Sequence, residues 1–156
     1  MDFKAVRFLL RKFGWRDARW YVGSNEVSGQ IQLELLKQEG CQPYSKVLEI
    51  GCGRLHAGVL IIQYLNKGNY VGVDPNEWVR REVMKKKSVR RLIEEKQVIF
   101  LNVSDFDVSV LNMKFDFVFS HSVLSHCANW QLEQFLRNTS NVLTPNGHIL
   151  ASCILA

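Results

Sequence analysis

The stretch VLEIGCGRLHAG, residues 47–58, decides the fold of this 156-residue chain. It begins with the apolar run VLEI and passes into Gly51-Cys52-Gly53, and a helical pattern begins at about residue 59. An apolar strand that ends in glycines before a helix is typical of a ligand-binding turn in an open parallel sheet. The glycines permit a tight turn and a close approach of a ligand to the backbone. The helix N-terminus offers free N–H groups with a partial positive charge.

Strand and helix patterns alternate on the C-terminal side of this turn. Apolar runs predict five strands, at about residues 47–50, 70–73, 98–101, 115–119 and 148–154. Helical spacing predicts the helices between them, at about 59–65, 76–95 and 129–143, and Pro145-Asn146-Gly147 predicts a turn before the last strand. This alternation predicts a mainly parallel sheet with helices on both faces. The expected fold class is therefore α/β, a three-layer α/β/α Rossmann-like sandwich.

The N-terminal part of the chain has a helical pattern of its own. Apolar residues recur at helical spacing over residues 3–13, and a second helix is expected to end near Gly40. We expect residues 1–40 to form a helical cover or lid and residues 41–156 to form the core, within a single domain overall. Two interpretations stay open for the aromatic residues of this part, a lid across a ligand or a packed helical cover: Trp15, Trp20 and Tyr21.

Composition and charge exclude several classes of protein. With 47% hydrophobic and 22% charged residues the chain is neither disordered nor fibrous. The net charge of +5 permits an anionic ligand or nucleic acid without requiring one, and we interpret the basic run from Arg80 to Arg91 as a solvated helix face. No apolar run approaches the length of a membrane span, so we expect no membrane partner.

The cysteines and histidines indicate neither a disulfide framework nor a metal site. The four cysteines lack CxxC spacing and follow no secretory signal, which favours free thiols in a reducing compartment and a cytoplasmic location. His56, His121 and His126 do not have the spacing of metal ligands, so no metal is expected.

Two residues of the glycine turn argue against a dinucleotide. The dinucleotide fingerprint needs glycine or alanine where this chain has His56. Glu49 lies two residues before the first glycine, and a carboxylate there suits a cationic or hydrogen-bond-donating ligand better than a pyrophosphate.

The segment VLEIGCG resembles motif I of the class I S-adenosylmethionine-dependent methyltransferases, an apolar strand with an acid before GxGxG. Glu49, Gly51 and Gly53 match this motif, and Leu55 takes the place of the third glycine. FDFVFSHSVLSH, residues 115–126, is similar to the family's FDxVxSxxVLxH form of motif IV, and LTPNGHIL resembles its L-x-P-G-G turn. The resemblance covers Tyr21 to about Ala151 and implies a divergent branch of this family.

The resemblance implies a cofactor site made by the ends of several strands. Asp74 ends the second strand, at the spacing of a ribose-binding acid, and Asp105 matches the acid that receives the adenine amino group. Alternatively, Asp74 caps the next helix and Asp105 has only a cap or turn role. The implied cofactor contacts are Glu49, Gly51, Cys52, Gly53, Asp74, Pro75, Asn76, Ser104, Asp105 and Ser120.

His121 is the candidate catalytic residue. Neutral imidazole in the loop after the fourth strand can accept a proton from a hydroxyl or amine near pH 7. The alternative is a hydrogen-bonded loop histidine without a chemical role.

The resemblance implies an S-adenosylmethionine-dependent methyltransferase (EC 2.1.1.-) that acts on a small-molecule O or N acceptor. One alternative is a non-catalytic scaffold or subunit domain of the same fold, and a nicotinamide-dependent oxidoreductase is another. A nucleic-acid methyltransferase is a further alternative. Methylation of the amino groups of bases is disfavoured, because no N/D-P-P-Y/F tetrad follows the fourth strand.

The end of the chain does not fit the family's seven-stranded core, because the sequence stops directly after the fifth strand. We expect either a C-terminally truncated piece of a longer protein or self-association through the edge of that apolar strand.

Overall fold

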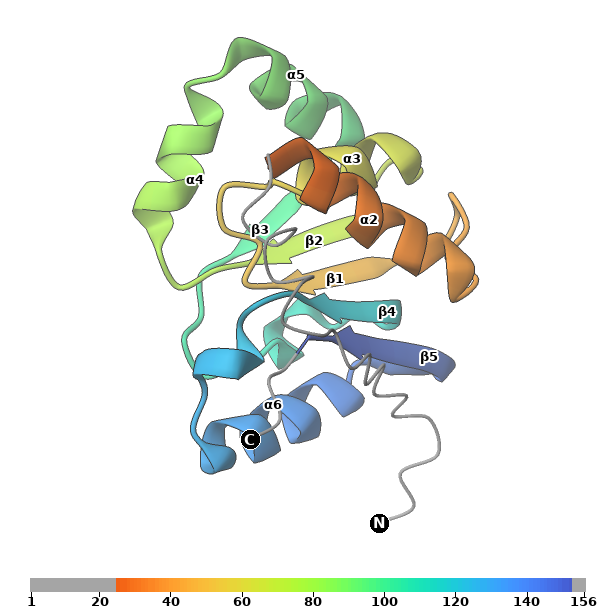
Figure 1. The fold of residues 1–156 in the computed structure, drawn as a ribbon, viewed down its shortest axis with the longest axis vertical. Helices are drawn as coiled ribbons and strands as arrows, with labels where there is room; N and C mark the ends of the chain where they lie inside the picture. Colours follow the sequence, from red (N-terminus) through yellow and green to blue (C-terminus); the bar gives the residue numbers. More distant parts are fainter. Residues whose placement is uncertain (1–24, 153–156) are drawn as a thin grey trace.

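The computed structural model describes residues 25–152, whose five strands form one parallel sheet (Figure 1). The strand order is β3-β2-β1-β4-β5, so the chain turns back at β1 and the carboxyl ends of β1, β2 and β4 meet at one edge. This edge is the topological switch point at which open parallel sheets bind ligands. The strands are β1 (Val47–Ile50), β2 (Tyr70–Val73), β3 (Ile99–Leu101), β4 (Phe115–Ser120) and β5 (Leu143–Ala151).

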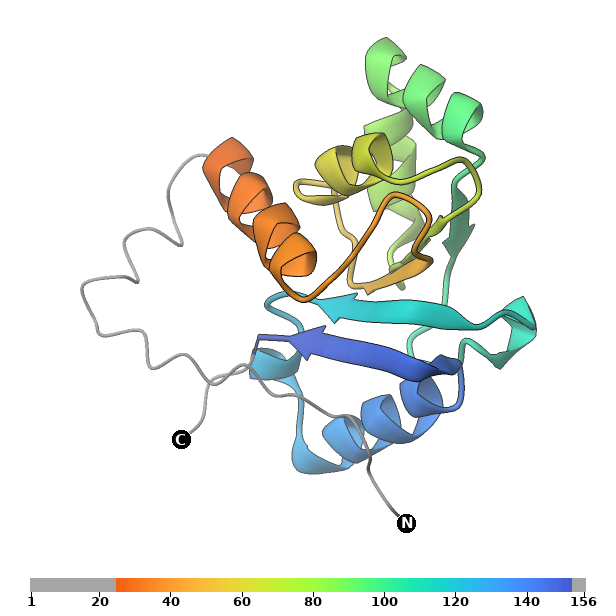
Figure 2. The same ribbon diagram turned by 90° about the vertical axis from the view of Figure 1, so that its right-hand side faces the viewer.

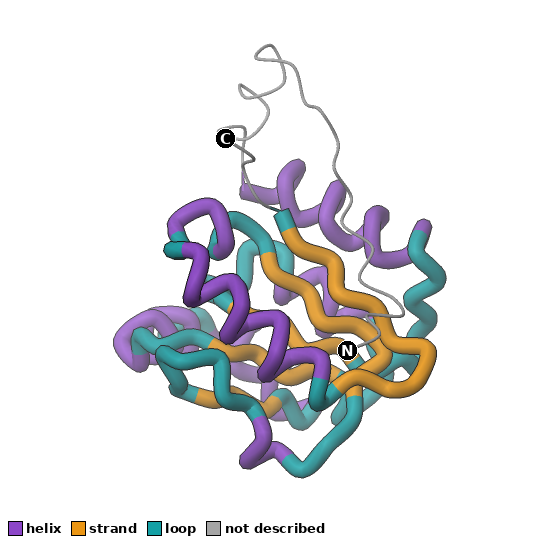
Figure 3. Tube along the Cα trace, turned by 90° about the horizontal axis from the view of Figure 1, so that it is seen from below, coloured by secondary structure: helices purple, strands orange, loops and turns teal. Residues whose placement is uncertain are grey.

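Helices cover both faces of the sheet, which confirms the predicted three-layer α/β/α class. One face carries α2 (Asn25–Gln38), α3 (Gly58–Tyr64), α4 (Glu77–Met84) and α5 (Lys87–Lys96), and the other carries α6 (Asn129–Ser140). Two short 3-10 turns, η1 (Ser109–Leu111) and η2 (Leu124–His126), complete the described chain. Figure 2 shows α2 and α6 on opposite sides of β4 and β5, and Figure 3 shows the strands as a layer between the helices.

The two apolar layers follow from the alternation of side chains along the strands. In β1, Val47 contributes to the layer beneath α2 and α3, and Leu48 contributes to the layer above α6. All four residues of β1 are buried, because helices cover both faces of this central strand. Phe135 of α6 is fully buried at 0% exposure and anchors the second layer.

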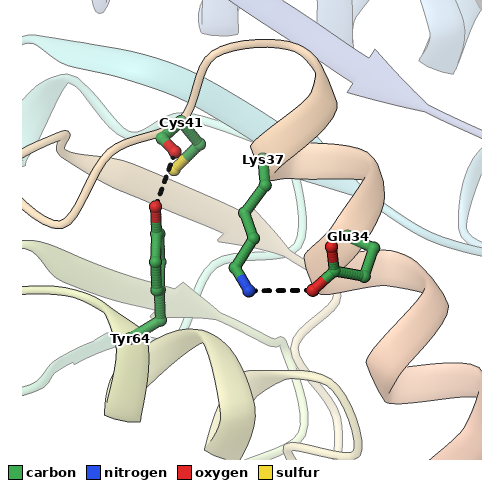
Figure 4. A network of polar contacts seen from close by, with 4 residues as sticks. All are labelled: Glu34, Lys37, Cys41 and Tyr64. Carbon is green, nitrogen blue, oxygen red and sulfur yellow. Dashed lines mark hydrogen bonds and ion pairs between the residues drawn. The ribbon is translucent and has the colours of Figure 1, made fainter.

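Helix α2 is fixed to α3 by polar contacts (Figure 4). The Tyr64 hydroxyl donates to the carbonyl of Cys41 at 2.9 Å, just beyond the end of α2. Lys37 Nζ lies 5.0 Å from the centre of the Tyr64 ring and 2.8 Å from a carboxylate oxygen of Glu34. The described part of the N-terminal segment thus packs on the core. The predicted lid function of residues 1–40 stays a prediction, and residues 1–24 lie outside the described residues.

The predicted helix over 76–95 is wrong, because the structure has two helices with a break at Lys85 and Lys86. Lys86 is extended, with ψ near 107°, and this turns α5 back toward the sheet. The break lets Val83 of α4 and Ile93 of α5 enter the same apolar cluster. One straight helix of 20 residues would span about 30 Å, too long for both of its ends to stay on the sheet.

The last strand begins earlier than predicted, at Leu143 rather than near His148. Leu143 pairs with Phe115, and His148 pairs with Phe117, so the residues of the predicted Pro145-Asn146-Gly147 turn form an irregularity inside β5. Proline cannot donate to the sheet, which explains why the ladder is interrupted here. Among the described strands β5 pairs with β4 alone, and its predicted self-association stays a prediction. None of the helices within residues 25–152 is long and apolar enough to cross a membrane.

Candidate cofactor site at the strand ends

The turn after β1 has the left-handed backbone that its glycines favour. Gly51 and Gly53 have φ of 76° and 47°, and the N–H groups of Gly51 and Cys52 both donate to the carbonyl of Val73, at 2.8 and 3.0 Å. These bonds fix the turn to the end of β2. Leu55, in the position of the motif's third glycine, is also left-handed, with φ of 58°.

Leu55 adopts a left-handed backbone at the position where the motif has a glycine. A left-handed conformation costs a residue with a Cβ about 1–2 kcal/mol. The Leu55 side chain is 1% exposed in the core, and such burial contributes about 1.5–3 kcal/mol. The core contact therefore offsets the backbone strain.

Asp74 joins the ends of the first two strands. Its Oδ2 accepts the N–H of Gly53 at 3.0 Å, and its Oδ1 accepts the N–H of Asn76 at 2.8 Å. The second bond is a local turn contact with Asn76, which is itself the N-cap residue of α4, so the alternative in which Asp74 caps this helix is wrong. A carboxylate has about four acceptor sites, so about two stay available for a ligand's hydroxyl groups.

A small pocket lies beside this junction. Four of the predicted cofactor contacts line it, namely Cys52, Gly53, Asp74 and Asn76. Six other residues line the pocket and were not predicted as site residues: Leu55, Arg80, Val83, Phe100, Leu101 and Asn102. A signal for Asn102 exists, since it follows β3 directly as Asp74 follows β2.

Glu49 lies elsewhere than expected. It is 5% exposed, and its carboxylate accepts a hydrogen bond from the Tyr70 hydroxyl instead of lining the pocket. Burial raises the pKa of Glu49 to about 7, and the bond from Tyr70 opposes this rise. Its predicted contact with the cofactor stays a prediction. Tyr70 was not predicted as the partner of Glu49, although a carboxylate in a buried strand needs a hydrogen-bond donor.

Ser104 and Asp105 are exposed and do not line the pocket. Asp105 Oδ1 accepts the N–H of Asp107 at 3.1 Å, as the turn interpretation expects. Pro75 is exposed between the pocket residues Asp74 and Asn76. The cofactor contacts predicted for Ser104, Asp105 and Pro75 stay predictions.

The loop after β4 packs directly on the glycine turn. A Cβ at Gly51 would lie 2.2 Å from a methyl group of Val123, so only glycine fits there. Ser120 is fully buried beside the end of β1, and its hydroxyl has no hydrogen-bond partner within residues 25–152. His121 is half-buried, and this burial lowers its pKa from 6.5. The structure thus brings the candidate catalytic loop to the glycine turn.

The geometry agrees with the comparison with known families. The family described as "Methyltransferase domain" matches residues 48–149. This chain belongs to that family. It has the class I S-adenosylmethionine-dependent methyltransferase fold, which confirms the resemblance drawn from the motifs.

Several solved structures share the fold. The PH0226 protein of Pyrococcus horikoshii OT3 is 25% identical, with a TM-score of 0.65 over 85% of this chain and 60% of that one. The glycopeptide N-methyltransferase MtfA is 14% identical, with a TM-score of 0.66 over 82% of this chain and 54% of that one. Magnesium protoporphyrin IX methyltransferase (ChlM) of Synechocystis PCC 6803, solved with bound S-adenosylmethionine, is 18% identical, with a TM-score of 0.62 over 85% and 61%.

This methyltransferase domain spans about three fifths of the length of those proteins or less. Within residues 25–152, no group of three or more His, Cys, Asp or Glu side chains is placed to hold a metal ion.

Proposed function

We propose that this methyltransferase domain binds S-adenosylmethionine at the pocket beside Asp74 and transfers its methyl group to a small-molecule O or N acceptor. The observation that carries the proposal is the junction of Gly53 and Asp74. The Gly53 N–H donates to Asp74 Oδ2 at 3.0 Å, at the carboxyl ends of neighbouring parallel strands. Open parallel sheets bind ligands at this place.

Three features of the chain fit this cofactor. The position of a Cβ at Gly53 has only the Gly51 carbonyl oxygen nearby, at 3.9 Å, so a ligand can approach the backbone there. Asp74 retains acceptor sites that suit ribose hydroxyls. Phe100 and Leu101 give the pocket an apolar wall that suits a purine ring.

The chemistry assigns limited tasks to the protein. When bound, S-adenosylmethionine supplies an electrophilic methyl group on a positively charged sulfur. The protein then has to align the acceptor and exclude water. Val123 packs against the glycine turn. To His121 of the same loop we assign the role of accepting the proton that an O or N acceptor loses.

The function is tested by transfer of tritium from methyl-labelled S-adenosylmethionine to pools of small phenols, carboxylic acids and amines. We expect label in at least one pool. MtfA and ChlM are methyltransferases whose names specify a glycopeptide and magnesium protoporphyrin IX, and this supports the choice of discrete molecules as acceptors. A folded chain that binds the cofactor and labels no pool would favour the scaffold alternative.

Asp74→Ala is expected to weaken S-adenosylmethionine binding by about 1–3 kcal/mol, the range for hydrogen bonds to a charged group. The loss has two sources, the acceptor for ribose and the bond that holds the Gly53 N–H. Calorimetric titration measures it. Methionine, which has no ribose, serves as the control ligand and should be affected less, and an equal loss for both ligands would contradict a ribose contact.

His121→Asn is expected to lower kcat by about 100-fold or more, the usual contribution of a general base. Burial lowers the pKa of His121 below 6.5, so the imidazole is neutral at pH 7 and loses its acceptor as the pH falls through that lowered pKa. The acid limb of kcat/KM should therefore lie below pH 6.5 and be absent in the variant. His126→Asn, an exposed histidine of the same loop, is the control and should keep the limb.

A further inference from the structure

Helices α4 and α5 stand at the β3 end of the sheet (Figure 1). Together with the start of β3 they form a second open depression, beyond the cofactor pocket. The lining residues are Arg80, Arg81, Met84, Lys85, Arg90, Ile93, Val98 and Phe100, which we call the α4–α5 groove. Four cations thus surround four apolar side chains.

Positive charge is concentrated in the segment of the chain that forms most of this groove. Residues 77–96 contain eight Lys and Arg against four Glu, a net charge of +4. The rest of the described residues contains six Lys and Arg against nine Asp and Glu, a net charge of −3. Within residues 25–152 the groove is therefore a positive region among otherwise acidic segments, and it attracts an anionic partner.

Among the described residues 25–152, two of the groove's cations have no acidic partner. Arg80 Nη2 lies 3.7 Å from Glu77 Oε1, and Lys85 Nζ lies 2.5 Å from Glu82 Oε1. Arg81 and Arg90 form no ion pair within residues 25–152, and neither lines the cofactor pocket. Their guanidinium groups are available for paired hydrogen bonds to carboxylates.

The apolar part of the groove decides which kind of anion fits. Met84, Ile93 and Val98 are aliphatic, and the flexible thioether of methionine adapts to aliphatic partners. Phe100 is the one aromatic side chain among the described residues that line the groove, and it is half-buried, whereas single-stranded nucleic acid is held by several stacking rings. The chain's own residues 1–24 carry six Lys and Arg against two Asp, a net charge of +4, so like charges oppose their entry.

We propose that the α4–α5 groove binds an acidic amphipathic segment of a partner protein. Aliphatic side chains of the segment fill the apolar floor, and its carboxylates pair with Arg81 and Arg90. This interaction does not depend on the methyl-transfer proposal. Because Arg80 and Phe100 line both the groove and the cofactor pocket, the segment would lie directly beside the cofactor.

The test uses the full chain and a fluorescent peptide of about 18 residues, with Leu at helical i, i+3, i+4 and i+7 spacing and Glu at most other positions. Fluorescence anisotropy at about 0.1 M salt should give saturable binding. Arg81→Glu and Arg90→Glu should each weaken binding by about tenfold. Arg137→Glu is the matched control, because Arg137 is an exposed arginine of α6, on the opposite face of the sheet, and it should leave binding unchanged.

Two comparison ligands separate this partner from other anions. A peptide with every Leu replaced by Ser keeps the charge and should bind about tenfold more weakly, since it cannot fill the apolar floor. Equal binding of the two peptides, or no effect of Arg81→Glu and Arg90→Glu, would overturn the proposal. Tighter binding of an oligouridine of about 20 nucleotides or of phosphatidylserine vesicles would overturn it as well. Unchanged S-adenosylmethionine binding in both arginine variants verifies their fold and separates this result from the proposed enzymatic function.

Discussion

Gly53→Val is expected to weaken S-adenosylmethionine binding by about 100-fold or more while the sheet stays folded. The branched side chain would occupy the open space beside Gly53, where the structure leaves room for the ligand. It would also strain the turn, because Gly53 has φ of 47°, and this threatens the bond from its N–H to Asp74. Calorimetric titration measures the affinity, and urea unfolding measures the stability.

Two further variants separate the loss of ligand space from backbone strain. Gly53→Asn places a side chain in the same space, but asparagine tolerates positive φ, so it should lose binding with little loss of stability. Gly68→Val carries comparable strain at φ of 79°, with nothing within 4 Å and outside the pocket, so it should lose stability and keep the affinity. Normal affinity in both Gly53 variants would mean that the turn is only structural.

The free energy of unfolding is expected to fall by about 3 kcal/mol between pH 4.5 and pH 7 through Glu49 alone. Burial raises the pKa of Glu49 from 4.5 to about 7. In this window the folded chain holds the proton more tightly than the unfolded chain, so each step upward in pH favours unfolding. The stability from this group is fully present below pH 4.5 and is lost as the pH rises to about 7. Urea unfolding at a series of pH values measures the slope.

Glu49→Gln isolates this effect from the titration of other groups. The amide has the same shape, can still bond to Tyr70 and carries no charge, so the variant should lose the Glu49 part of the slope and be more stable than the wild type at pH 8. Tyr70→Phe removes the donor to the carboxylate, which should raise the pKa of Glu49 further and destabilise the chain most at high pH. Parallel pH curves for the wild type and Glu49→Gln would show that Glu49 titrates normally.

The sequence predicts most of the sheet because its central strands are short, mostly apolar and followed by turn residues. β1 and β2 lie where the apolar runs place them. The break at Lys86 was not predicted, because the helical periodicity of apolar residues continues on both sides of Lys86. The break is needed only because one straight helix would be longer than the sheet that it covers. The early start of β5 was missed because Pro145 and Gly147 are typical of a turn, whereas here they lie within an interrupted ladder.

The candidate site could be predicted where backbone geometry determines it. Gly53 and Asp74 meet because the ends of neighbouring parallel strands are adjacent. The direction of a side chain is harder to predict, since Glu49 follows the strand alternation into the layer that contains Tyr70. The left-handed backbone of Leu55 could not be predicted from the residue type either, because leucine rarely adopts this conformation. Here the burial of its side chain in the core stabilises it.

The central claim is that the junction of the glycine turn and Asp74 holds S-adenosylmethionine, and calorimetric titration of the chain with this cofactor tests it most directly. The account predicts one site per chain, competition by S-adenosylhomocysteine, no comparable binding of NAD and a loss of affinity in Asp74→Ala. A folded chain that gives no binding heat and no displacement, or that binds NAD as tightly as S-adenosylmethionine, would contradict the account.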